Sequence, residues 1–187
     1  MPPKVKVAKE DIINASVEIV RNCGAEALNA RTLANALNCS TQPIFSNFAS
    51  MDDLHFAVIM KAAKLYQDCM DREMNAGVYP AYKASGMAYI RFAKEEKELF
   101  KLLFMRDRKA NNDNIGDDMF DGMVGFVQDY TGLGQSDAAL FHLELWAYVH
   151  GIATMFATGF LDLEWDLVSQ MMTDAYLGLR KRYETEK

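Results

Sequence analysis

Five polar side chains between residues 31 and 47 have the types and spacing needed to hydrogen-bond the edges of nucleic-acid bases. They are Arg31, Thr41, Gln42, Ser46 and Asn47. A glutamine can form two hydrogen bonds with adenine, and Ser46 follows Gln42 by about one helical turn, so both would lie on one side of a helix. These side chains could therefore read a DNA sequence. The alternative is that they are ordinary polar surface residues.

The residues around them predict two short helices joined by a tight turn. Asn29 is suited to cap a helix over residues 30–37, and Asn38 is suited to end it in the left-handed conformation. Ser40 is expected to cap a second helix, over residues 40–47. The apolar contacts between the two helices would come from Leu33, Ala34, Leu37, Ile44 and Phe48. This pattern is typical of a helix-turn-helix whose second helix enters the major groove.

The motif R-T-L-A-x-A-L-x-C-S-T-Q-P-I-F-x-x-F-x-S-x-x-D-L, which starts at Arg31, resembles the N-terminal signature of TetR/AcrR-family transcriptional regulators. The segment from Ile12 to Gly24 resembles the first helix of that family, and W-A-Y-V-H-G at residues 146–151 is similar to a Trp-His-Gly element in one class of TetR C-terminal domains. The resemblance implies an all-α fold of about nine helices. A three-helix DNA-binding head would occupy residues 1–50, and a helical ligand-binding and dimerisation domain would occupy residues 51–187.

The same resemblance implies a one-component regulator, expected to act as a repressor. It would bind a palindromic operator in double-stranded DNA as a homodimer and respond to a small apolar or aromatic effector. The residues assigned to DNA contact are Arg31, Thr41, Gln42, Phe45, Ser46, Asn47, Lys4 and Lys6. Arg31 matches a family position that reaches a phosphate or a base, although a solvated surface arginine is the alternative.

The chain departs from the family pattern at two positions that often contact phosphate. Phe45 stands where the family usually has Tyr, and Met51 stands where it usually has Lys. Each loss would lower DNA affinity without changing base choice. Lys4, Lys6 and Lys9 could compensate from a flexible arm. These departures leave open an alternative function, a ligand-binding helical dimer with degenerate DNA binding.

Aromatic and methionine side chains recur after the motif, and the resemblance implies that they line an effector pocket. The expected lining is Tyr66, Met70, Tyr89, Phe92, Met105, Phe120, Met123, Trp146 and His150. The chain has 12 methionines, whose flexible side chains can repack around varied apolar ligands. For each residue taken alone, an ordinary core position is the alternative. His150, one turn from Trp146, is either a ligand contact or a core histidine with its hydrogen bonds satisfied.

Two predicted helices near the C-terminus, over residues 137–158 and 162–183, carry apolar residues at three- and four-residue intervals. Those residues are Leu140, Leu143, Ala147, Ala153, Ala157, Leu167, Val168, Met171, Met172, Ala175 and Leu179. Ser136 is expected to cap the first helix and Gly159 to end it. A stripe this broad exceeds what one neighbouring helix covers, so we expect a four-helix dimer interface. The alternative is a purely intramolecular core.

Composition limits the other functions. Half of the 187 residues are hydrophobic and only four are proline, which favours a globular helical protein. The net charge of −6 is uneven: residues 1–50 hold five Lys and Arg against four Asp and Glu, net +1, which leaves −7 for residues 51–187. DNA binding depends on local cations, so this balance does not exclude it. There is no membrane-length apolar run or signal peptide, and we expect a cytoplasmic protein without a membrane partner.

Catalytic and metal sites find no support in the sequence. The three cysteines, Cys23, Cys39 and Cys69, lack metal-ligand spacing. We expect them to be small buried fillers rather than a thiol sensor. The three histidines have no motif-spaced serine, cysteine or carboxylate partner. The sequence therefore predicts a protein that is not an enzyme and carries no metal or cofactor.

Overall fold

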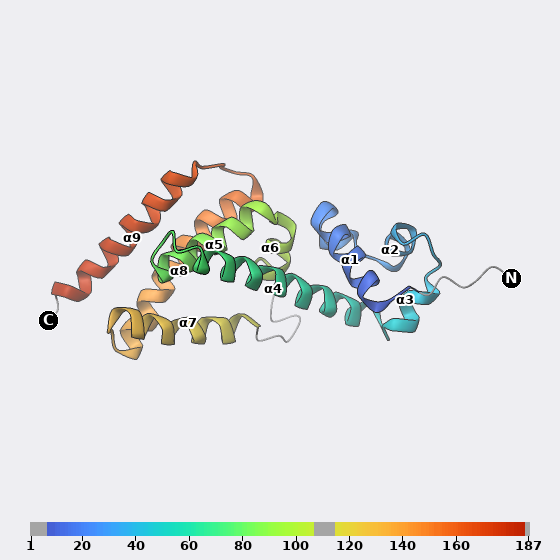
Figure 1. Cartoon of the computed structure of the whole chain (residues 1–187), viewed down its shortest axis with the longest axis horizontal. Helices are drawn as coiled ribbons and strands as arrows, with labels where there is room; N and C mark the ends of the chain where they lie inside the picture. The colour runs from blue at the N-terminus through green and yellow to red at the C-terminus, as the bar shows by residue number, and fades with distance from the viewer. Residues whose placement is uncertain (1–6, 107–114, 186–187) are drawn as a thin grey trace. The chain divides into compact units, whose positions relative to one another are not determined.

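In the computed structural model, residues 7–106 and 115–185 are described, and all their regular structure is helical (Figure 1). This confirms the all-α fold class. The helices of this part are α1 (Lys9–Cys23), the 3-10 helix η1 (Ala25–Ala27), α2 (Ala30–Ala36), α3 (Gln42–Asn47), α4 (Met51–Asn75), α5 (Ala81–Glu95), α6 (Lys97–Phe104), α7 (Ile115–Thr131), α8 (Gln135–Thr158) and α9 (Trp165–Thr185). Lys4 and Lys6 lie outside the described residues, as does the side chain of Phe120.

The helices form two compact units. Unit 1 consists of Met1–Gln67 and Glu96–Met105, and unit 2 consists of Asp68–Glu95 and Arg106–Lys187. Helix α4 contributes residues to both units, and α6 belongs to unit 1 although α5 before it belongs to unit 2. These units are defined by packing rather than by activity. The functional division expected between residues 50 and 51 therefore stays a prediction.

Helix α1 runs through unit 1 and buries a stripe made of Ile12, Ser16, Val17 and Val20. Gly24 ends the helix at φ +82°, a backbone conformation that is strained for any residue with a side chain. Its amide donates to the carbonyl oxygen of Val20 at 2.8 Å. A Cβ at Gly24 would lie 3.2 Å from Oε2 of Glu98. The glycine thus allows both the end of α1 and a close approach of α6.

Local hydrogen bonds fix the start of α2 and the turn after it. Oδ1 of Asn29 accepts hydrogen bonds from the amides of Arg31 at 3.0 Å and Thr32 at 3.1 Å, which confirms the predicted cap. Asn38 has φ +50°, which confirms the predicted left-handed end. The amide of Cys39 still donates to the carbonyl oxygen of Ala34. The turn therefore extends further along the chain than the sequence suggested.

This longer turn explains why the predicted Ser40 cap is wrong. Helix α3 begins at Gln42, Thr41 occupies the N-cap position, and no side chain caps the helix. Pro43 lies in the first turn, where its missing amide leaves no hydrogen bond unmade. Helix α4 is capped more completely. The amide of Asp53 donates to Oγ of Ser50 and the amide of Ser50 donates to Oδ2 of Asp53, each at 3.1 Å.

A buried apolar core holds the helix-turn-helix to the rest of unit 1. Its fully buried side chains include Ile12, Leu33, Ile44, Leu54, Leu99 and Phe100. Burial of one such side chain contributes about 1.5–3 kcal/mol, so this core provides a rigid base for α3. The exposed side chains of α3 do not contribute to this core.

Helix α5 is the central helix of unit 2, since nine of its fifteen residues are buried. A Cβ at Gly86 would lie 2.6 Å from Cε of Met172 on α9 and 3.5 Å from Cγ2 of Val149 on α8, so α5 approaches both helices closely. The ammonium of Lys83 donates to the hydroxyl oxygens of Ser169 at 2.7 Å and Thr173 at 2.8 Å, which also ties α5 to α9.

Two predicted boundaries in unit 2 are wrong. Helix α8 begins at Gln135 with Gly134 as its N-cap, so Ser136 lies inside the first turn and does not cap it. Gly159 does end α8, at φ +70°, as predicted. The amides of Phe160 and Leu161 then donate back to the carbonyl oxygen of Met155. These bonds hold the chain in a turn, so α9 starts only at Trp165 rather than at residue 162.

Candidate nucleic-acid interface and aromatic site

Helix α3 buries Ile44 and leaves its polar side chains exposed or half-buried. Gln42 and Ser46 are exposed, and Thr41 and Asn47 are half-buried. Ile44 is fully buried and anchors the helix. The structure therefore presents the four polar side chains on one short element, as the spacing predicted.

The hydrogen bonds of α3 distinguish Gln42 from the other polar residues. Oγ of Ser46 donates to the carbonyl oxygen of Gln42 at 2.8 Å, and Nδ2 of Asn47 donates to the carbonyl oxygen of Pro43 at 2.8 Å. The side chain of Gln42 has no hydrogen-bond partner in the described part of the chain. Its amide therefore keeps both a donor and an acceptor for a base edge.

Phe45 is the large apolar side chain on the exposed side of α3. It is 49% exposed, so about half of its surface can contact a partner. An aromatic ring in this position can contact the methyl group of thymine or the sugar of the DNA backbone. It cannot donate the hydrogen bond that a tyrosine would offer to a phosphate.

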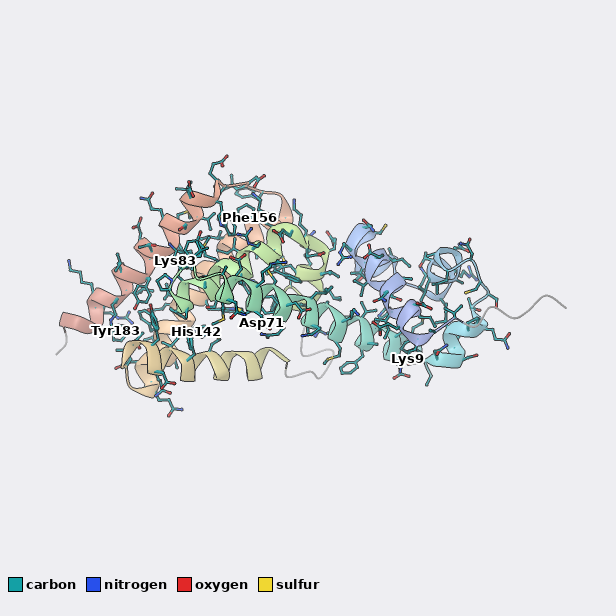
Figure 2. The ribbon with its side chains drawn as sticks, viewed as in Figure 1. Lys9, Asp71, Lys83, His142, Phe156 and Tyr183 are labelled. Atoms are coloured by element: carbon teal, nitrogen blue, oxygen red, sulfur yellow. The ribbon has the colours of Figure 1, made fainter. Side chains whose placement is uncertain are left out.

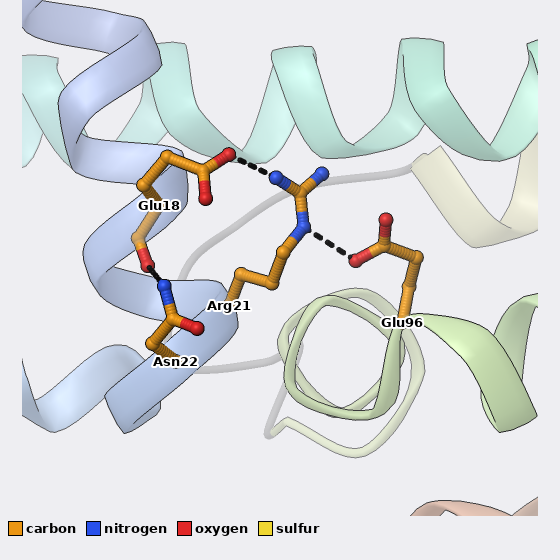
Figure 3. A network of polar contacts seen from close by, with 4 residues as sticks. All are labelled: Glu18, Arg21, Asn22 and Glu96. Carbon is orange, nitrogen blue, oxygen red and sulfur yellow. Dashed lines mark hydrogen bonds and ion pairs between the residues drawn. The ribbon is translucent and has the colours of Figure 1, made fainter.

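One arginine of unit 1, Arg21, forms ion pairs with two acidic groups. Nε of Arg21 lies 2.7 Å from Oε2 of Glu96, and a second nitrogen of the guanidinium bonds Glu18 (Figure 3). The hydrogen bond with Glu96 raises the pKa of Arg21, and burial opposes it. Nδ2 of Asn22 donates to the carbonyl oxygen of Glu18. Arg21 therefore joins α1 to the start of α6 and has little charge to offer to another partner.

Ion pairing divides the other cations of unit 1 into two groups. Nζ of Lys61 lies 2.7 Å from Oε1 of Glu10, and Nζ of Lys101 lies 2.6 Å from Oε1 of Glu98. Other cations are exposed and have no carboxylate partner within the described residues; they include Lys9, Arg31 and Lys97. The unpaired Arg31 lies in the first turn of α2, where the sequence predicted a DNA contact.

In unit 2, two tyrosine–histidine pairs connect α5 with α8. The hydroxyl of Tyr82 lies 3.0 Å from Nδ1 of His142, and the hydroxyl of Tyr89 lies 2.9 Å from Nδ1 of His150. Residue numbers rise in the same direction along both helices, so α5 and α8 run parallel. The pairs fix the register of the two helices as well as their separation.

The pair formed by Tyr89 and His150, together with Trp146, contains three of the predicted effector-site residues. The rings of Trp146 and His150 are stacked, with centroids 5.2 Å apart and an angle of 22° between their planes. Tyr89 is buried and reaches His150 from α5, and Phe92 is buried on the same helix. The structure thus brings Tyr89, Trp146 and His150 together.

The remaining predicted effector-site residues are not shown to join this group. Tyr66 and Met105 belong to unit 1, where the ring of Tyr66 packs edge-on against Phe104 at 5.2 Å. Met105 is largely exposed because α6 ends at Phe104. Met70 and Met123 are half-buried in unit 2. Whether any of these residues contacts an effector stays a prediction.

The pair formed by Tyr82 and His142 was not predicted from the sequence. Both side chains are buried, within an aromatic group that includes Phe126, Phe141 and Tyr176. Figure 2 labels His142 in unit 2. Burial lowers the pKa of His142 and raises the pKa of Tyr82, so both groups are neutral near pH 7. A signal existed in the sequence, because Tyr82 and Tyr89, like His142 and His150, are separated by about two helical turns.

The cysteines differ from one another in exposure. Cys69 is buried, Cys39 is half-buried and Cys23 is exposed, so a buried filler describes only the first of them well. Within residues 7–106 and 115–185, no three or more His, Cys, Asp and Glu side chains gather as they would around a metal ion. None of the described helices combines the length and the apolar content needed to span a bilayer.

Comparisons with known proteins place these features in a family. Residues 82–176, half of the chain, match the family model described as "Tetracyclin repressor-like, C-terminal domain". Among solved structures, the chain is similar to a TetR-like transcriptional regulator from Rhodococcus sp. RHA1, with 15% sequence identity, a TM-score of 0.71 and 100% of each chain covered. At this identity the structural likeness concerns the fold. A search of curated proteins gives no match. With its family match over half of its length, the chain belongs to the TetR family of transcriptional regulators.

Proposed function

We propose that the chain is a homodimeric repressor that binds a palindromic operator in double-stranded DNA through α3 and is released by a small apolar or aromatic effector. The observation that carries the proposal is the exposed side of α3. It combines the amide of Gln42, which has no partner among the described residues, with the exposed aromatic ring of Phe45. A buried residue, Ile44, holds the helix from behind.

Each residue of this surface has a specific part in the proposed contact. Thr41 and Gln42 are at the N-terminal end of α3, the end with which recognition helices approach base edges. Gln42 would bind adenine through two hydrogen bonds, and Phe45 would contact a neighbouring thymine methyl. Ser46 donates its hydroxyl hydrogen to its own helix and keeps only acceptor capacity, whereas Asn47 donates one amide hydrogen and keeps Oδ1 and a second N–H. Arg31 would reach a phosphate or a base.

The proposed dimer is supported by apolar side chains on the outer sides of α8 and α9. Leu140 and Leu143 on α8 and Leu167 and Leu177 on α9 are exposed, and each shows more than two fifths of its surface. Not every residue of the predicted stripe has this role. Four of them, Ala153, Ala157, Val168 and Met172, are buried inside unit 2 and serve its own core. A dimer would present two reading helices to half-sites separated by about 34–36 Å or a multiple of it.

The proposed effector site is centred on Trp146, His150 and Tyr89. Stacked aromatic rings offer flat apolar surfaces, and the imidazole and hydroxyl groups offer a few fixed polar contacts. This combination suits a small ligand that is itself apolar or aromatic. Binding there would act on α5 and α8, because these residues belong to those two helices.

Selection from a random duplex library tests the DNA proposal. The full-length protein is expected to enrich a near-palindromic sequence with an adenine at equivalent positions of both halves. If the protein stays dimeric but enriches no sequence at low salt, the alternative is favoured, namely a ligand-binding helical dimer with degenerate DNA binding. That alternative is motivated by Phe45 and Met51, which lack the phosphate contacts of tyrosine and lysine.

Sedimentation of two charge variants tests the dimer. Leu143→Glu places a carboxylate on the outer side of α8 and is expected to yield monomers that bind a full operator weakly. Leu161→Glu is the matched control, because Leu161 is similarly exposed but lies in the segment between α8 and α9. Equal effects of the two variants, or a monomeric parent protein, would contradict the proposed interface.

Native mass spectrometry of the protein purified from its own cells tests the effector site. A small adduct is expected on the parent protein, and Trp146→Ala is expected to reduce its occupancy. Tyr148→Ala is the control on the same helix, since Tyr148 is exposed there. An adduct retained equally by both variants would place the effector elsewhere.

A further inference from the structure

Lys9, the first residue of α1, is held at the junction of α3 and α4. Its Nζ lies 4.9 Å from the centroid of the Phe48 ring, a distance at which a cation is attracted to an aromatic face. Phe48 is 4% exposed and, with an extended backbone, follows the last residue of α3 and precedes the Ser50 cap of α4 by two residues. Figure 2 shows Lys9 in the region where α1, α3 and α4 meet.

Three carboxylates of α1 and α4 have other partners. The carboxylate of Glu10 pairs with Lys61 at 2.7 Å, and Oδ2 of Asp11 accepts the amide of Ala8 at 3.3 Å. At the start of α4, Asp53 accepts the amide of Ser50. Lys9 is exposed and has no carboxylate partner in the described part of the chain. The ring of Phe48 orients its ammonium but does not neutralise it.

We propose that Lys9 binds a backbone phosphate of DNA beside the C-terminal end of the reading helix α3, and that Phe48 positions its ammonium for this contact. The inference rests on the proposed DNA-binding function and deepens it. A lysine loses side-chain rotamer freedom when it is ordered on binding, and the contact with Phe48 limits that freedom before DNA arrives. A phosphate contact of this kind fixes the position of the head on the duplex and leaves base choice unchanged.

The structure gives Lys9 a different place from the one its sequence suggested. A lysine near the N-terminus was expected to act from a flexible arm. Instead, Lys9 belongs to α1 and its side chain lies against a buried ring. This arrangement supplies a positive charge next to α4, whose first residue, Met51, has none.

The salt dependence of binding to a random-sequence duplex tests this contact without knowledge of the operator. Lys9→Gln is compared with Lys97→Gln, which removes the same charge from another exposed lysine of unit 1 that has no carboxylate partner in the described part of the chain. Lys97 lies at the other end of α1 from Lys9. Its neighbour Glu96 bonds Arg21, which is twelve residues, or about 18 Å, further along α1 than Lys9. Lys9→Gln is expected to lower the slope of log affinity against log salt by about 0.9 for each bound head, and Lys97→Gln to leave it unchanged.

Two further variants separate the charge from its positioning. Lys9→Arg keeps a cation that can lie over the ring and is expected to retain the parent slope. Phe48→Leu keeps an apolar side chain in the core but removes the aromatic face. It is expected to weaken binding at every salt concentration while the slope stays near that of the parent protein. A thermal unfolding curve confirms that the head of each variant is folded.

The outcomes distinguish this inference from the function on which it rests. If the parent protein binds no duplex even at low salt, the proposed DNA-binding function fails, and the Lys9 contact fails with it. If the parent binds and Lys9→Gln keeps its slope, or loses no more than Lys97→Gln, only the Lys9 contact is overturned. A change of base preference in Lys9→Gln would also overturn it, since a phosphate contact carries no sequence information.

Discussion

The candidate sites in the two units differ in the exposure of their polar side chains. In unit 1, Gln42 on α3 is exposed and has no hydrogen-bond partner within residues 7–106 and 115–185. In unit 2, Tyr82 and His142 are buried against each other, with 3.0 Å between the hydroxyl and Nδ1. Water can satisfy an exposed amide at little cost, whereas a buried polar group must find a partner within the protein. An exposed group can therefore exchange water for a ligand, and a buried pair serves to fix a structure.

The same contrast applies to the cations of unit 1. Arg21 is committed to Glu18 and Glu96, and these bonds join α1 to α6. Arg31 and Lys9 have no carboxylate partner in the described residues, and both belong to the helices that surround α3. The net charge does not distinguish cations that form ion pairs from those that do not, because it counts both equally. The part of the charge that matters for DNA is the part without an internal partner.

The largest expected effect comes from Gln42→Ala. Because Gln42 is exposed, the free energy of unfolding should change by no more than about 0.5 kcal/mol. Binding to the selected operator should weaken by about 1–3 kcal/mol for each head, through loss of the paired hydrogen bonds to adenine. Ser46→Ala is the control and should weaken binding less, since Ser46 already donates to its own helix. Competition binding measures operator affinity, and chemical denaturation measures the free energy of unfolding. A loss of stability with unchanged selectivity would mean that Gln42 supports the fold and does not recognise a base.

Tyr82→Phe is expected to lower the stability of the protein, whereas Gln42→Ala is expected to weaken DNA binding. Removal of the hydroxyl takes a hydrogen-bond partner from the buried His142, which should lower the free energy of unfolding by about 1–3 kcal/mol. Tyr130→Phe removes a hydroxyl from the same aromatic group, but Tyr130 is 43% exposed and its hydroxyl loss should cost less than about 0.5 kcal/mol. Chemical denaturation compares the variants. Equal losses would mean that the hydroxyl of Tyr82 is no more important than one that water can reach.

The helix ends that the sequence predicted correctly are those fixed by local backbone chemistry. The Asn29 cap, the left-handed Asn38 and the end of α8 at Gly159 each depend on residues within a few positions of one another. Ser40 and Ser136 failed as caps for a related reason. A serine indicates that a helix starts nearby, but the neighbouring turn decides at which residue.

The pairs that organise the candidate sites depend on distant partners. Tyr82 meets His142 across 60 positions of sequence, and the ring under Lys9 is contributed by Phe48. Periodicity can show which side of a helix is apolar, but it does not specify the neighbouring helix or the register against it. For the same reason, the sequence could not separate the buried Ala153 from the exposed Leu143 on α8.

The buried histidine also predicts how stability responds to acid. Burial lowers the pKa of His142 below its ordinary value of 6.5. Below about pH 6.5 the unfolded chain therefore binds more protons than the folded protein. The stabilising effect of keeping His142 neutral is complete above that pH and is lost as the pH falls toward the lower folded pKa, by up to about 1.4 kcal/mol per pH unit. Denaturation of His142→Phe at pH 7 and at pH 5.5 should show less of this loss, and the control His55→Gln should retain it.

The smallest expected effect is a gain at the start of α4. Met51→Lys adds a cation to the helix that begins next to Phe48 and Lys9, where it can reach a phosphate. The salt slope for random-sequence duplex should become steeper by about 0.9 for each head, with a small loss of stability because a cation is unfavourable at a helix N-terminus. Met60→Lys makes the same change at an exposed position on α4, about 13 Å further along the helix. An equal steepening in both variants would mean that added charge acts through the general field of the protein, and that the junction of α3 and α4 has no particular place in DNA binding.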